Sequence, residues 1–175
     1  MRNLTEQLTQ YAAYHRDRRN ILTHFVGIPM IVLAVAVLLA RPVFAQWGAV
    51  AVSPATVVTA LTVLYYLKLD VRLGAAMAVL LALSLWFAQA VGAQSTAVWL
   101  TVGIGLFVVG WVIQFIGHYY EGRKPAFVDD LVGLIIGPLF VVAELGFLMG
   151  LRPELQQAIE ERVGPVREAP PARAA

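Results

Sequence analysis

Residues 16–40 read RDRRNILTHFVGIPMIVLAVAVLLA, a short basic island followed by an apolar run that holds no lysine, arginine or acid. A helix of about 20 apolar residues crosses the ~30 Å hydrocarbon core of a bilayer. We therefore predict a transmembrane helix over Ile21–Ala40, with Gly27 and Pro29 bending it near its start.

The rest of the chain repeats this pattern of apolar runs between charged islands. It is 59% hydrophobic and 14% charged, whereas a soluble domain carries about 25% charged residues. The predicted fold class is all-α: a polytopic membrane helix bundle with about five transmembrane segments, within a range of roughly four to six. The other segments are Val43–Leu67, which Ser53-Pro54 divides into a partial helix and a later spanning part, Val71–Val91, Thr96–His118 and Leu131–Gly150.

The N-terminal residues are predicted to form an amphipathic interfacial helix. Asn3 and Glu6 have the spacing of a capping box. One helical face is shared by Leu4, Leu8, Tyr11 and His15. Such a helix lies on the membrane surface or against other helices. Residues 1–20 lack the apolar region of a signal peptide, so we expect no cleaved leader.

The C-terminal residues 151–175 are predicted to leave the membrane. Pro153 suits the first turn of a short helix over Glu154–Arg162. The Pro/Ala-rich tail that follows is predicted to be disordered.

The distribution of lysine and arginine predicts the orientation. With a cytoplasmic N-terminus, the cytoplasmic segments hold Arg2, Arg16, Arg18, Arg19, Lys68, Arg72, Arg123 and Lys124, and Arg41 alone lies opposite among the first four spans. We expect a bacterial inner-membrane protein with its N-terminus inside. Five full spans would put the basic C-terminal tail outside, against the rule, so the fifth span and the side of the tail stay open.

All three histidines of the chain, His15, His24 and His118, fall at or near the predicted cytoplasmic interface. Two equal sides give this arrangement a chance of about one in four, and a lone interfacial histidine often only presents its polar tip to headgroups. Helical spacing adds polar neighbours on the same faces: Asn20 with His24, and Gln114 with His118 and Glu121. A bend near Arg19-Asn20 would let His15 and His24 meet.

Three imidazoles, a carboxylate and no cysteine predict a site for iron(II) or zinc, and such sets with open positions are typical of non-haem iron centres that activate dioxygen. Glu121 is the candidate carboxylate, with Asp129 and Asp130 as alternatives that also suit helix capping. The polar surroundings favour haem less. Glu144, the clear acid inside a predicted span, lies too far along its helix to share the metal and marks a function of its own.

Three stretches of the chain stand out together: Tyr14-His15 … Asn20 … His24-Phe25-Val26-Gly27-Ile28-Pro29, Gln114-Phe115-Ile116-Gly117-His118 … Glu121 … Lys124-Pro125-Ala126, and Gly137-Pro138-Leu139-Phe140 … Glu144. In combination they resemble the 2-hydroxy fatty acid dioxygenase family of small membrane proteins, typified by a fungal endoplasmic-reticulum enzyme of phytosphingosine breakdown. The resemblance covers about residues 5–150, nearly all of the predicted membrane-embedded catalytic domain (1–150).

The resemblance implies an Fe(2+)-dependent dioxygenase that shortens a 2-hydroxy fatty acid by one carbon, without 2-oxoglutarate. It implies metal ligands at His15, His24 and His118, with Glu121 or water in place of a fourth histidine. We take Glu121, Asn20 and Gln114 as catalytic candidates. The cations that would hold the substrate carboxylate are Arg16, Arg19, Arg123 and Lys124, although the positive-inside pattern also explains most of them.

The expected partners are a 2-hydroxy long-chain fatty acid, dioxygen and membrane lipids, with no nucleic acid, and a homo-oligomer stays among the alternatives. Two other functions compete with the dioxygenase. One is a non-catalytic transporter or assembly protein that uses Glu144, and the other is a zinc-dependent membrane lipid hydrolase.

Overall fold

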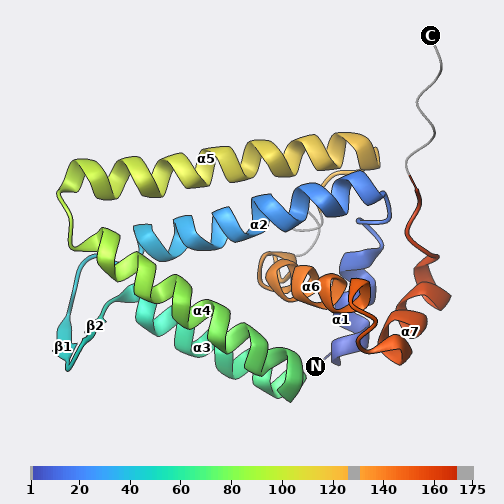
Figure 1. The fold of residues 1–175 in the computed structure, drawn as a ribbon, viewed down its shortest axis with the longest axis horizontal. Helices are drawn as coiled ribbons and strands as arrows, with labels where there is room; N and C mark the ends of the chain where they lie inside the picture. Colours follow the sequence, from blue (N-terminus) through green and yellow to red (C-terminus); the bar gives the residue numbers. More distant parts are fainter. Residues whose placement is uncertain (1, 126–130, 169–175) are drawn as a thin grey trace, which may run out of the picture. The chain divides into compact units, whose positions relative to one another are not determined.

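The computed structural model describes residues 2–125 and 131–168 of the 175-residue chain. These residues are mostly helical (Figure 1). They divide into two compact units. We call residues 27–112 the hairpin unit, and residues 1–26 with 113–175 the histidine unit. In chain order the elements are α1 (Leu4–Ala12), α2 (Arg18–Leu38), β1 (Ala45–Trp47), β2 (Val50–Val52), α3 (Pro54–Leu69), α4 (Val71–Gly92), α5 (Thr96–Glu121), α6 (Gly133–Leu148) and α7 (Pro153–Val163).

In the hairpin unit, α3 and α4 form a helical hairpin joined at a single residue. Asp70 ends α3 and also begins α4, where its side chain accepts a hydrogen bond from the backbone N–H of Leu73 at 2.9 Å. A Cβ on Gly74 would lie 2.7 Å from the backbone of Leu67. This contact is too close for any side chain, so glycine permits the two helices to approach here.

The predicted partial helix before Ser53 is wrong, because this segment is a two-stranded antiparallel hairpin. β1 pairs with β2 in the register Ala45 to Val52. Gly48 in the turn has a φ of +57°, which suits a tight turn and is incompatible with a helix. The side-chain amide of Gln89 on α4 donates to the carbonyl of Ala51 at 3.0 Å, which gives the hairpin a partner that local sequence does not reveal.

Three described helices are long and apolar enough to cross a membrane: α2, α4 and α5. The pair α6 and α7, bent by 113°, makes a fourth if it counts as one broken span. The predicted five spans are not confirmed. The hairpin takes up the start of the second apolar run, so α3 keeps only 16 residues, about 24 Å at 1.5 Å per residue. The apolar helices nonetheless indicate a membrane protein.

In the histidine unit, α1 packs against α6 and α7. The capping box is confirmed: Asn3 Oδ1 accepts from the Glu6 N–H at 2.9 Å, and Glu6 Oε2 accepts from the Asn3 N–H at 3.0 Å. The predicted stripe is buried at all four positions, Leu4, Leu8, Tyr11 and His15. The short C-terminal helix is present as α7 and begins at Pro153.

Candidate metal centre

Three chain segments of the histidine unit bring the three histidines together. His15 follows α1, His24 lies in the second turn of α2, and His118 lies in the last turn of α5. One ring nitrogen from each lies within 4.8 Å of the others, and the side chains are 0%, 1% and 7% exposed. The bend that lets His15 meet His24 lies just before Arg18, where α2 begins.

Backbone carbonyls fix the tautomers of two of these rings. Nδ1 of His15 lies 2.7 Å from the carbonyl of Tyr11, and Nδ1 of His24 lies 2.8 Å from the carbonyl of Asn20. A carbonyl can only accept, so each Nδ1 carries the proton and each Nε2 keeps its lone pair. Metal-binding histidines are held in this way, with the other ring nitrogen donating to an oxygen.

Several buried polar atoms around the rings have no hydrogen-bond partner. They are His15 Nε2, His118 Nδ1, Asn20 Oδ1 and Gln114 Nε2. An unsatisfied buried polar atom costs about 1–3 kcal/mol, so a cluster of them normally marks the place of a ligand or ion. The donor set fits a metal ion: the orphaned nitrogens belong to two of the three converging rings.

The protonation state of His15 also suits coordination. Burial, together with the nearby His24, holds the pKa of His15 well below its ordinary value of 6.5. Its imidazole is therefore neutral at pH 7 and can donate a lone pair without first losing a proton.

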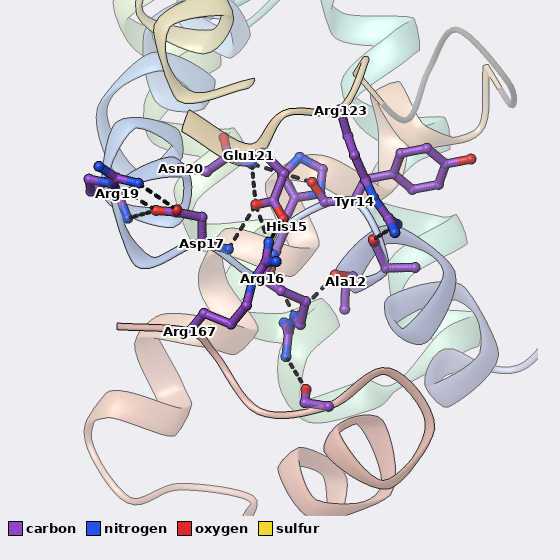
Figure 2. Close-up of polar contacts among 12 residues, drawn as sticks. Ala12, Tyr14, His15, Arg16, Asp17, Arg19, Asn20, Glu121, Arg123 and Arg167 are labelled. Carbon is purple, nitrogen blue, oxygen red and sulfur yellow. Dashed lines mark hydrogen bonds and ion pairs between the residues drawn. The ribbon is translucent and has the colours of Figure 1, made fainter. Parts of the chain in front are cut away.

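Glu121 contacts the segments that carry all three histidines (Figure 2). It ends α5, one turn after His118. Its Oε2 accepts from the backbone N–H groups of Arg16 at 2.9 Å and Asp17 at 2.8 Å, and from the Asn20 side chain at 3.1 Å. Among the described residues, the converging ligand atoms come from the histidines and not from this carboxylate. Glu121 therefore braces the turn after His15.

The other two catalytic candidates border the histidines from different helices. Asn20 is fully buried, and its backbone carbonyl holds His24 while its side chain contacts Glu121. Gln114 lies one turn before His118 on α5, and is buried with its amide nitrogen unpartnered. The further acidic alternatives Asp129 and Asp130 lie outside the described residues.

Arg16, a predicted substrate cation, is engaged inside the protein. Its guanidinium donates to Glu144 Oε1 at 3.1 Å and to the carbonyl of Gly164. It also donates to the carbonyls of Ala12 and His15 (Figure 2). Glu144 thus pairs with Arg16, the residue directly after His15.

The remaining predicted cations lie nearer the surface. Arg19 forms a two-point pair with Asp17 and lies over the Tyr120 ring, with 4.5 Å between the guanidinium carbon and the ring centre. Arg123 donates to the carbonyl of Ala13 at 2.8 Å, and Lys124 is exposed. A pocket of about 460 Å³ is lined in part by Arg16, Glu121, Arg123 and Arg167.

Two further residues support the site and were not among the predicted site residues. A Cβ on Gly117 would lie 2.5 Å from Asn20 Oδ1 and still closer to Thr23 Oγ1, so glycine lets α5 approach α2 beside His118. Arg167, in the predicted tail, binds Glu121 Oε1 at 2.6 Å. Gly117 lies within the sequence motif that ends at His118, and nothing local marks Arg167.

Comparison with known proteins gives two matches. Residues 1–149 match the family model described as 2-hydroxy-palmitic acid dioxygenase Mpo1-like. The chain is 31% identical over 160 residues to the 2-hydroxy-palmitic acid dioxygenase MPO1 of Saccharomyces cerevisiae, an alignment that covers 90% of this chain and 88% of the yeast protein. No solved structure shows significant similarity to the chain.

Proposed function

The chain belongs to the Mpo1-like family of 2-hydroxy-palmitic acid dioxygenases, and on this premise we propose that it is an iron(II)-dependent dioxygenase of 2-hydroxy fatty acids. The overall reaction cleaves the C1–C2 bond. One 2-hydroxy acid and one dioxygen give the fatty acid one carbon shorter, carbon dioxide and water. The observation that carries the proposal is the convergence of three buried histidines, two of which have a ring nitrogen without a hydrogen-bond partner.

The residues that would hold the metal are His15, His24 and His118. Imidazole ligands without thiolate suit iron(II), and a site with three protein ligands leaves positions for substrate and dioxygen. Bound iron(II) would supply the electrons that activate dioxygen and a positive centre for the hydroxyl and carboxylate of the substrate. Carbonyl groups of Tyr11 and Asn20 keep two rings in the ligating tautomer.

Other side chains would bind and orient the substrate. The buried Gln114 amide nitrogen has no protein partner, and we assign it as a donor to the substrate carboxylate or hydroxyl. Asn20 and Glu121 hold the histidine-bearing segments together and so act as positioning residues. Arg123, Lys124 and Arg19 would attract the carboxylate, while Arg16, committed to Glu144, would act through the turn that it stabilises.

The acyl chain of the substrate would stay among the apolar helices while its carboxylate reaches the histidines. The lysine and arginine distribution supports an inner-membrane protein with its N-terminus and metal centre on the cytoplasmic side.

Oxygen consumption tests the proposal. The purified protein in detergent is given iron(II) and 2-hydroxypalmitic acid, and we expect one dioxygen consumed for each pentadecanoic acid formed. Palmitic acid, which lacks the 2-hydroxyl, is the matched control and should give no product. The His24→Ala variant should lose both bound iron and turnover. Activity with zinc in place of iron would favour a hydrolase, and wild-type protein that binds no metal would exclude both enzymes.

A further inference from the structure

The segment after α7 runs along the turn that follows His15. The N–H of Arg167 donates to the carbonyl of Arg16 at 2.7 Å, and the N–H of Arg18 donates to the carbonyl of Arg167 at 3.0 Å. A surface ion pair between Arg18 and Glu168, at 2.7 Å, extends this pairing. We call residues 164–168 the C-terminal strap. The strap lies beyond residues 1–149, which the family model matches.

The C-terminal strap places the positive charge of Arg167 next to Glu121, the acid that braces the turn after His15. The guanidinium of Arg167 lies 2.6 Å from Glu121 Oε1, and the Glu121 side chain is only 1% exposed. A buried carboxylate is costly unless it is paired and hydrogen-bonded. The three neutral donors on Oε2 satisfy one oxygen, and Arg167 supplies both the charge and the hydrogen bond for the other.

Displacement of Glu121 would alter the positions of all three rings, because Glu121 contacts or belongs to the chain segment that carries each ring. His118 lies one turn earlier on the same helix. The Glu121 carboxylate holds the backbone N–H of Arg16, the residue after His15. It also accepts from the side chain of Asn20, whose carbonyl fixes His24.

We propose that Arg167 is a positioning residue of the three-histidine centre, which holds the Glu121 carboxylate in place so that the rings keep their ligating arrangement. This inference rests on the proposed function, because it takes the histidines as metal ligands. On this inference the C-terminal strap supports the metal site, although the strap lies outside the residues that the family model matches.

Cobalt(II) is a suitable probe, because its visible absorption reports ligand geometry as well as occupancy. We expect Arg167→Gln to weaken cobalt(II) binding roughly 10-fold or more, as loss of outer support does at other metal sites, and to alter the spectrum. Arg167→Lys, which keeps the charge, should remain within about threefold of the wild type. Arg162→Gln removes the same charge from the exposed end of α7 and should leave binding unchanged.

A pair of truncations gives an independent test. Ending the chain after Glu168 keeps the strap and should preserve cobalt(II) affinity, whereas ending it after Val163 should weaken it as Arg167→Gln does. Equal affinity and spectrum in Arg167→Gln and wild type, with binding abolished in His24→Ala, would overturn this inference and leave the metal centre standing. A wild type that binds no cobalt(II) would overturn the metal centre itself, and this inference with it.

Discussion

The guanidinium of Arg16 and the carboxylate of Glu144 form an ion pair at 3.1 Å in which the side chains are 7% and 10% exposed. It joins the turn after His15 to α6, the apolar helix that packs on α1. Removal of one partner of a buried pair leaves a charge without compensation, whereas replacement of both by apolar groups is often neutral.

We therefore expect Glu144→Gln to lower the free energy of unfolding by about 3 kcal/mol. The double variant Arg16→Met/Glu144→Leu should recover much of that loss. Denaturant titration of the metal-free protein in detergent measures both. A loss in the double variant equal to the sum of the losses in Arg16→Met and in Glu144→Leu would show that the pair is not coupled.

Asn20 offers a sharper test of the support beneath the histidines. Its side-chain amide donates to the buried Glu121, so Asn20→Asp would place a second carboxylate against the first and remove the donor. Asn20→Ala removes only the donor and leaves the carbonyl that holds His24. We expect metal affinity to fall roughly 10-fold in Asn20→Ala, and further in Asn20→Asp. Equilibrium dialysis measures the affinities, and the opposite ranking would contradict this assignment.

Gly117 is expected to tolerate no side chain, because a Cβ there would collide with Asn20 and Thr23. Gly117→Ala should cost roughly 1–3 kcal/mol of stability through overpacking and should weaken metal binding. Gly105 on the same helix is the matched control, since a Cβ there meets nothing within 4 Å. Thermal unfolding of the two variants compares them, and equal midpoints would show that α5 can move away from α2 at little cost.

The low pKa of His15 predicts a pH dependence of the metal-free protein. Below the ordinary value of 6.5 the unfolded chain binds a proton at His15 that the folded protein does not, so stability falls as the pH drops from about 7 toward 5. One such proton contributes about 1.4 kcal/mol per pH unit. His15→Gln should lose this part of the slope. Unfolding curves at several pH values measure this slope. A His15→Gln variant with the wild-type slope would show that His15 is not the group that takes up the proton.

Local rules predicted much of the molecule. The capping box at Asn3 and Glu6, the start of the last helix at Pro153, and the helices over the apolar runs all follow from spacing and composition. The histidines could be grouped because the lysine and arginine pattern predicts the same side of the membrane for all three, and the sequence also predicts a bend between His15 and His24.

Long-range partners could not be read in the same way. Glu121 shares a helix face with His118, but a helix face does not reveal that the N–H groups of Arg16 and Asp17 donate to its carboxylate. The hairpin before Ser53 replaced a predicted helix for the same reason, since Gln89 supports it from far along the chain.

Two of the three rings are held by the carbonyls of Tyr11 and Asn20, which are main-chain groups. A deep mutational scan would therefore detect only some of the contacts that hold the histidine rings. Substitutions of the histidines, Asn20 and Glu121 would stand out, whereas Tyr11→Phe would leave its carbonyl in place and register only as a change in packing. The contact that sets the tautomer of His15 is made by the backbone carbonyl of residue 11. It can therefore persist when the side chain at that position changes.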